Sequence, residues 1–93
     1  MLPNYPNPFN PETWIPFDLA EAADVLVTVY DSRGRVVRSW DLGRRDAGAY
    51  TGRDGAVYWD GRSATGDVAA SGSYYVELRA GEHASVRRIL LAK

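Results

Sequence analysis

The stretch Gly72-Ser73-Tyr74-Tyr75-Val76-Glu77-Leu78-Arg79-Ala80 decides the fold class. Apolar and polar residues alternate along it, which is the period of a β-strand with one buried face. The predicted inner face carries Tyr74, Val76, Leu78 and Ala80. The predicted outer face carries Tyr75, Glu77 and Arg79. We therefore expect a strand over Gly72–Ala80 that packs one side against a second layer.

The residues after this strand predict a hairpin. Gly81-Glu82 forms a tight connection to a last strand, Ala84–Ala92, whose apolar residues divide between two faces. One pair faces the core and the other leaves apolar surface for a partner. The first face has Val86 and Leu90, and the second has Ile89 and Leu91.

The preceding strand candidates are shorter. In Ala56–Asp60, Val57 and Trp59 share one face, and we expect both to line the core with the inner residues of Gly72–Ala80. Val25–Tyr30 is apolar on both faces, as a central strand requires.

Two more strands complete the pattern. The turn Asp31-Ser32-Arg33-Gly34, with Asp first and Gly fourth, joins Val25–Tyr30 to Arg35–Leu42 in a hairpin. The apolar residues of Arg35–Leu42 fall on both parities, which implies a bulge or an exposed ring. Thr13–Leu19 alternates as one half-buried strand, and Pro16, expected on its outer face, makes it an edge strand.

The segments between these strands are rich in glycine. We interpret residues 43–55 as a loop, and Asp60-Gly61 opens a second turn-rich stretch that runs to Gly72. The one helix candidate, residues 20–23, is too short to nucleate. About seven short strands with long loops and hairpins predict an all-β fold, an Ig-like antiparallel β-sandwich with Greek-key connections.

The N-terminal segment is a proline-rich arm. Four prolines lie between Pro3 and Pro11, and each fixes φ and removes a backbone donor, which excludes a helix or a central strand. Tyr5 and Phe9 are too apolar for a solvated spacer. We therefore expect residues 1–12 to form an extended, ordered arm with Phe9 at least half buried, and residues 13–93 to form the sandwich. The structural motif positions are Pro6, Asn7, Pro8, Phe9, Asn10, Pro11, Asp31, Gly34, Trp59, Asp60, Gly61 and Gly72.

Composition excludes several classes of function. The chain has 93 residues, enough for one domain, and its net charge of -1 gives no electrostatic case for nucleic acid. No apolar run approaches the ~18 residues of a membrane span, so we expect no membrane insertion. Met1 leads directly into the proline motif, so any export signal is expected in an upstream part. The absence of cysteine excludes disulfides and thiolate chemistry. We expect a monomer without a cofactor.

Catalytic and metal-binding readings are weak. The only histidine, His83, lies beside a hairpin turn without recognisable acid–base partners, so the chain is not expected to be an enzyme. Asp54, Asp60 and Asp67 lie beside glycines, where they are either calcium ligands or ordinary turn residues. Because Asp and Gly are the default turn residues, we favour the second interpretation and expect no metal.

The tryptophans leave a carbohydrate-binding platform open as an alternative. Large rings more often fill small β cores, and the parity of Trp59 places it there. Trp14 is expected to be exposed or covered by the arm, and Trp40 is ambiguous.

Several motifs together resemble a known family. The strings PNYPNPFNPET, VYDSRGRVV and YWDGRSATGDVAASGSYYVEL, followed by a short basic and apolar tail, resemble the C-terminal sorting-type domains of large secreted bacterial proteins. Those domains are associated with type IX secretion, and they are similar in fold to the Ig-like domain of the flagellar hook-capping protein. The stretch Ala47–Val57 is longer than the usual link in that family.

The resemblance implies a non-catalytic module of a secreted or cell-surface protein. Its partners would be secretion or surface-attachment machinery and the upstream domains of its parent. The residues implied in partner binding are Arg87, Arg88, Leu90 and Lys93. For the arginine pair, a charged edge that blocks aggregation is the alternative. An Ig-like spacer or interaction module is the second hypothesis for the whole chain, and a carbohydrate-binding module is the third.

Overall fold

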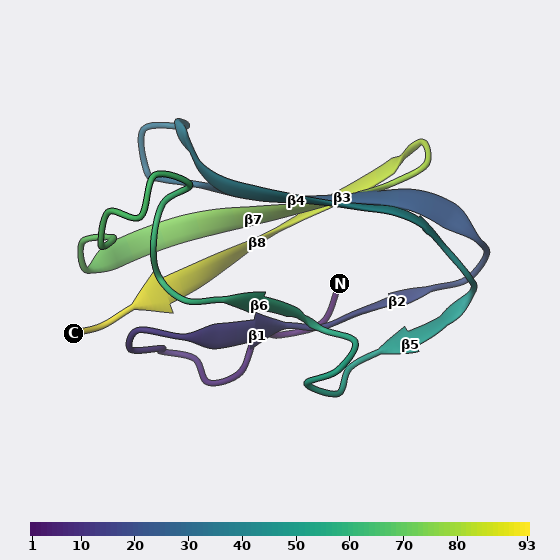
Figure 1. Ribbon diagram of the computed structural model, residues 1–93, viewed down its shortest axis with the longest axis horizontal. Coiled ribbons are helices and arrows are strands. Elements are labelled where there is room, and N and C mark those ends of the chain that lie inside the picture. Colours follow the sequence, from purple (N-terminus) through teal and green to yellow (C-terminus); the bar gives the residue numbers. More distant parts are fainter.

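The computed structural model describes residues 1–93 and is all-β (Figure 1). No helix is present that could cross a membrane. Its eight strands are β1 (Thr13–Ile15), β2 (Phe17–Leu19), β3 (Ala23–Tyr30), β4 (Val36–Arg45), β5 (Gly48–Tyr50), β6 (Val57–Trp59), β7 (Gly72–Ala80) and β8 (His83–Leu91).

One layer of the sandwich is a four-stranded antiparallel sheet in the order β4-β3-β7-β8. The predicted central position of β3 is confirmed, and β7 has the predicted bounds. The expected bulge in β4 is confirmed twice, because the pairing with β3 skips Val37 and Leu42. Each extra residue reverses the parity of those that follow, which explains how Val37, Trp40 and Leu42 differ in sequence parity and yet all pack against the core.

The second layer consists of two short sheets, β1-β6 and β2-β5 (Figure 1). The single strand expected over Thr13–Leu19 is wrong, because Pro16 divides it into β1 and β2. Pro16 is also buried rather than outward-facing, and its carbonyl accepts a hydrogen bond from the Leu2 N–H at 3.1 Å.

The loop expected over residues 43–55 is also wrong in part, because β4 continues to Arg45 and β5 follows. Three residues of β5 pair with β2, and the Tyr50 ring stacks on Phe17 with centroids 4.8 Å apart. A strand of three residues is too short to show an alternation of apolar and polar residues, so the sequence did not reveal it.

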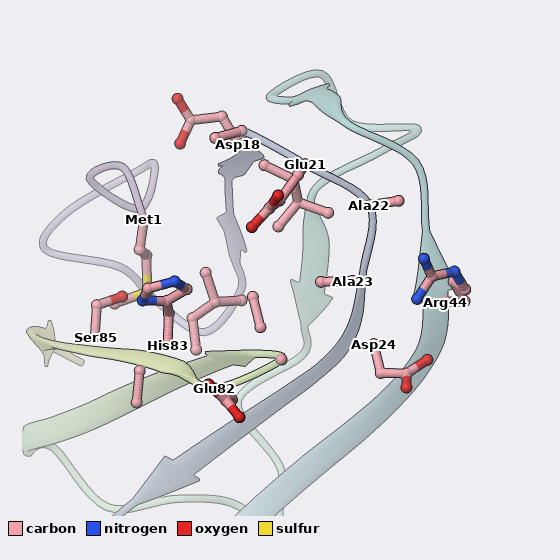
Figure 2. Close-up of a pocket in the computed structure, with 16 residues that line it drawn as sticks. Met1, Asp18, Glu21, Ala22, Ala23, Asp24, Arg44, Glu82, His83 and Ser85 are labelled. Carbon is pink, nitrogen blue, oxygen red and sulfur yellow. The ribbon is translucent and has the colours of Figure 1, made fainter.

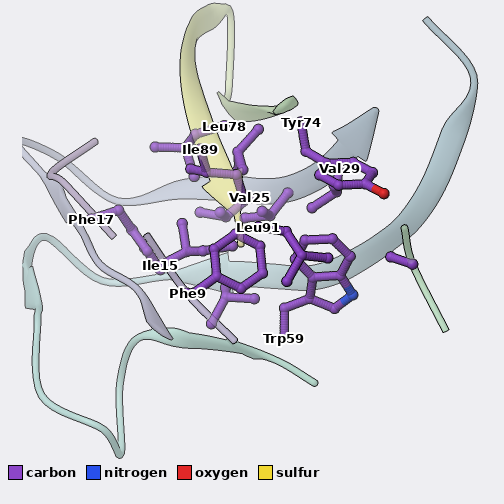
Figure 3. Close-up of a cluster of buried hydrophobic side chains, with 14 of the residues drawn as sticks. Phe9, Ile15, Phe17, Val25, Val29, Trp59, Tyr74, Leu78, Ile89 and Leu91 are labelled. Carbon is purple, nitrogen blue, oxygen red and sulfur yellow. The ribbon is translucent and has the colours of Figure 1, made fainter. Parts of the chain in front are cut away.

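A single core of fifteen residues lies between the layers (Figure 3). The predicted inner residues of β7 and β6 are confirmed as buried, namely Tyr74, Val76, Leu78, Val57 and Trp59. The other members are Phe9, Ile15, Phe17, Leu19, Val25, Val27, Val29, Ala69, Ile89 and Leu91.

The arm contributes Phe9 to this core, and the prediction of its burial is confirmed at 1% exposure. Its ring lies 5.4 Å from that of Trp59, beside Leu91 (Figure 3). The Phe9 N–H donates to the Leu90 carbonyl at 2.9 Å, and the Phe9 carbonyl accepts from the Ala92 N–H at 3.0 Å. Phe9 thus forms a parallel bridge with the end of β8.

The arm is ordered but not simply extended. It bends around Pro6–Pro8 and again near Pro11, and the peptide bonds before Pro6, Pro8 and Pro11 are cis. Ahead of these bends, Tyr5 pairs with Trp14 in β1, and the buried Asn4 donates through Nδ2 to Thr13 Oγ1 at 3.0 Å. The arm therefore connects both layers of the sandwich.

Two motif turns have clear local causes. Asp31 Oδ1 accepts from the N–H groups of Arg33 and Arg35 at 2.9 and 3.0 Å, and Gly34 takes a φ of 83°. The hydrogen bond from the Arg35 N–H, followed by that from Arg33, lowers the pKa of the Asp31 carboxyl. Gly61 has a φ of 79°, and a Cβ there would collide with the carbonyl of Pro11.

Candidate protein-interaction surface

The outer edge of β8 is open along most of its length. β7 pairs with one edge of β8, and at the other edge only the Leu90 carbonyl and the Ala92 N–H are bonded, both to Phe9. Backbone groups alternate in direction along a strand, so Ala84, Val86 and Arg88 point the same way as Leu90. Their N–H and C=O groups have no backbone partner there.

The side chains of these residues lie on the outer face of the four-stranded sheet, away from the core. Val86 is 60% exposed and Leu90 is 42% exposed, and Arg88 lies between them opposite Tyr75 of β7, which is 37% exposed. We name this group of four residues the outer β7–β8 patch. The predicted division of β8 into two faces is confirmed, because Ile89 and Leu91 are buried on the other side.

The structure places the four predicted partner-binding residues differently. Arg88 and Leu90 belong to the outer β7–β8 patch. Arg87 is exposed but points to the opposite face of β8. Lys93 lies beyond the strand, where its N–H donates to Ser71 Oγ at 3.2 Å. The structure therefore does not gather all four at one point.

Two patch members were not among the predicted site residues. Tyr75 was expected to face outward and Val86 to share a face with Leu90, so the signal was present in the parity of both strands. What the sequence lacked was the register of the predicted β7–β8 hairpin, which sets Tyr75 opposite Arg88 and diagonal to the two aliphatic residues.

The rings of Trp14 and Trp40 contact other side chains of this chain. The Arg53 guanidinium lies 4.4 Å from the Trp14 ring centroid, and the Tyr5 ring stacks on Trp14 at 6.1 Å. The Arg38 guanidinium lies 5.3 Å from the Trp40 ring. These cation–π contacts stabilise the small sheet and β4, and they cover faces on which a sugar ring would stack.

Two tyrosines, Tyr58 and Tyr74, have raised pKa values. Tyr58, next to Trp14 in the second layer, donates to Glu12 Oε2 at 2.6 Å, and this hydrogen bond raises the pKa of the Tyr58 hydroxyl. Burial raises the pKa of Tyr74, whose hydroxyl donates to the Ala70 carbonyl at 2.6 Å.

A groove of about 500 Å³ lies at one end of the sandwich, between the β2–β3 connection and the β7–β8 hairpin (Figure 2). His83 lies there beside Met1 and Ser85, and Glu21 and Glu82 also line the groove (Figure 2). No three His, Asp or Glu side chains are placed to hold a metal ion.

Two of the aspartates considered as calcium ligands accept hydrogen bonds from neighbouring residues of the chain. Asp60 Oδ1 accepts from Arg38 Nη1 at 3.2 Å and from the Arg62 N–H at 3.0 Å. Asp67 accepts from the Thr65 hydroxyl at 3.0 Å. Both carboxylates thus accept hydrogen bonds in their turns, as aspartates at turn positions commonly do.

Comparison with known proteins agrees with this fold. Residues 9–83 match the family described as the FlgD Ig-like domain. This chain belongs to that family. The match includes the arm residue Phe9, the core strands and the first residue of β8, so the open edge lies beyond the matched residues.

Curated relatives include the basal-body rod modification protein FlgD of Escherichia coli, 39% identical over 71 residues, and that of Salmonella typhimurium, 36% identical over 64 residues. These alignments cover 73% and 68% of this chain. The chain spans only 29% and 25% of the relatives' own lengths.

Solved structures show the same fold. FlgD from P. aeruginosa superposes with a TM-score of 0.64 at 26% identity, covering 86% of this chain and 60% of that one. PorZ of Porphyromonas gingivalis, described as an essential bacterial surface component of the type-IX secretion system, gives a TM-score of 0.64 at 21% identity, covering 98% of this chain and 11% of PorZ. Latent PorU of the same organism gives 0.63 at 17% identity, covering 96% and 9%.

Proposed function

We propose that this chain is a non-catalytic sorting or attachment module that directs a large secreted bacterial protein to export and the cell surface. The protein partners are components of the secretion or attachment machinery, and they bind the outer β7–β8 patch. Upstream domains of the parent protein are the second class of partner.

One observation carries the proposal. Five of the eight exposed large hydrophobic side chains lie on the outer face of the four-stranded sheet. They are Leu26, Val36, Tyr75, Val86 and Leu90. Three of them belong to the patch, so the exposed apolar surface is concentrated on β7 and β8. Exposed apolar side chains gathered on one face support a protein-binding role for that face.

The chemistry of the patch suits a protein partner. Tyr and Arg are enriched at the energetically important centres of protein interfaces, and the patch presents Tyr75 beside Arg88. Arg88 takes no part in an ion pair, because the pairs are Arg35–Asp31, Arg38–Asp60 and Arg79–Glu77. Its guanidinium is available to a partner carboxylate.

The sorting role is supported by the motif resemblance and by the fold shared with PorZ, a surface component of the type-IX secretion system. The second candidate is an Ig-like spacer or interaction module within a larger assembly. It is favoured by the family itself and by relatives named as basal-body rod modification proteins.

A reporter fusion tests the sorting role. The 93 residues are fused to the C-terminus of a reporter that carries a signal peptide, in a type IX-competent host. Deleting Arg88–Lys93 is a poor perturbation, because it also removes the buried Ile89 and Leu91. The double substitution Val86→Ser and Leu90→Ser removes exposed apolar groups and leaves the core intact.

The matched control is Leu2→Ser with Val68→Ser, two exposed hydrophobic residues away from the outer face. We expect the unmodified fusion and the control variant to reach the cell surface and the patch variant to stay inside the cell. All three should have the same melting temperature. Failure of the unmodified fusion to reach the surface contradicts sorting and favours the spacer. Normal display of the folded patch variant contradicts a role for the patch.

A further inference from the structure

We infer that the open edge of β8 binds its partner by strand addition, and that the partner is an extended protein segment carrying acidic and β-branched residues. The inference deepens the proposed function, because it names how the same β-strand is recognised. It concerns the backbone of Ala84–Arg88, whereas the proposed function rests on side chains.

The backbone of this segment is prepared for an added strand. Ala84, Val86 and Arg88 direct their N–H and C=O groups outward, while Ser85 and Arg87 direct theirs to β7. Five residues at ~3.3 Å each give an open edge of roughly 17 Å, about the length of a common strand. Extended peptides pair with exposed edges of this kind.

The chain's own arm shows that this edge accepts a partner. Phe9 pairs with Leu90 and Ala92 in the parallel sense at 2.9 and 3.0 Å, on the same edge and with the same set of alternate residues. Because Phe9 occupies the Leu90–Ala92 end, it also limits the free segment to the residues before Leu90. An added strand continues the edge that the arm has begun to cover.

The charges beside the edge define the chemistry of the added segment. Arg87 and Arg88 lie on opposite faces of β8, both are exposed, and neither belongs to an ion pair. Two neighbouring acids on an added strand also point to opposite faces, so they match this arginine pair. A β-branched residue next to them packs on Val86.

The arginines also argue against a second copy as the occupant. An exposed edge with adjacent positive charges discourages pairing between identical edges. An acidic segment gains from the same charges, so the surface favours a foreign strand over self-association. Self-pairing is an outcome that the experiment detects.

The test uses the full chain and two capped synthetic peptides. The probe is Thr-Val-Asp-Glu-Val-Thr, and the matched control has Lys-Lys in place of Asp-Glu. Binding is followed by NMR titration of the backbone amides. We expect the acidic peptide to bind at least tenfold more tightly than the basic one and to weaken with added salt. The amides of Ala84, Val86 and Arg88 should become protected from hydrogen exchange, while those of Ser85 and Arg87, already bonded to β7, change little.

A pair of variants separates backbone pairing from side-chain contact. Val86→Pro removes an outward N–H without removing a β7–β8 hydrogen bond, and Val86→Thr keeps that N–H and the β-branched shape. We expect at least a tenfold loss of binding for Val86→Pro and less than a threefold change for Val86→Thr. Ala84→Pro repeats the test at a second outward N–H if Val86→Pro fails to fold.

Three results overturn the inference. They are absence of acidic-peptide binding by the parent chain, equal binding of the basic peptide, and undiminished binding by a folded proline variant. Sedimentation that shows a dimer broken by Val86→Pro assigns the edge to a second copy instead. None of these readouts depends on export, so strand addition fails or stands separately from the sorting role.

Discussion

Replacing Phe9 by alanine should strongly destabilise the whole domain. The ring is 1% exposed and packs 5.4 Å from the Trp59 ring, so its removal leaves a cavity between the two layers. Buried Phe→Ala changes cost about 3–5 kcal/mol, and a domain of this size is stable by only about 5–14 kcal/mol. With about 4–8 °C per kcal/mol, the melting temperature should fall by about 12–40 °C.

Urea denaturation and calorimetry measure this effect, with two controls. Leu2→Ala truncates an exposed arm residue whose backbone N–H, the group bonded to Pro16, is unchanged, so it should cost less than about 0.5 kcal/mol. Phe9→Leu keeps most of the apolar volume and should cost under about 2 kcal/mol. If Phe9→Ala lowers stability no more than Leu2→Ala, the arm is not part of the core and the reasoning fails.

Three further changes test the turns and the core. Gly61→Ala should destabilise the domain more than Gly66→Ala in urea denaturation. Both glycines have positive φ, so each substitution costs about 1–2 kcal/mol, but only the Cβ at residue 61 meets the Pro11 carbonyl. Equal losses of stability would contradict that contact. Folding lowers the pKa of Asp31, so the unmodified chain should have a larger free energy of unfolding than Asp31→Asn. This difference should be full above pH 3.8 and should shrink as the pH falls through the folded-state pKa. A difference that stays constant between pH 7 and pH 2 would contradict this role of Asp31. Trp59→Phe should cost about 1–3 kcal/mol, because it removes the hydrogen bond from the buried indole N–H to the Arg62 carbonyl at 2.8 Å and part of a fully buried ring; an unchanged urea midpoint refutes this.

The sequence predicted the strands whose burial follows local alternation. The faces of β7 and β8 were correct because each has one buried side, and a period of two then determines which residues point inward. The bulges in β4 could be foreseen for the same reason, since a broken parity needs an extra residue.

Features that depend on a distant partner could not be predicted. β5 exists because β2 pairs with it, and Gly48-Ala49-Tyr50 has no pattern of its own. The burial of Phe9 was foreseen from its apolar ring, but its parallel pairing with Leu91 joins residues at opposite ends of the chain. No local rule contains that contact.

The candidate surface was predictable in the same partial way. The exposure of Arg87, Arg88 and Leu90 follows from the edge position and parity of β8. The addition of Tyr75 does not, because it depends on the register between β7 and β8, which sets Tyr75 opposite Arg88. The open backbone of Ala84–Arg88 becomes visible only once β8 is known to be an edge.

The parallel bridge between Phe9 and Leu91 determines how this domain responds to mechanical load. Because the arm and β8 run in the same direction, a pull between residues 1 and 93 slides the two segments past each other and strains both hydrogen bonds at once. The buried Phe9 ring must leave the core in the same step. The residues before Phe9 can detach one at a time, so resistance to extension is concentrated at the Phe9–Leu91 bridge. The rest of the sandwich bears the force only after this bridge has broken.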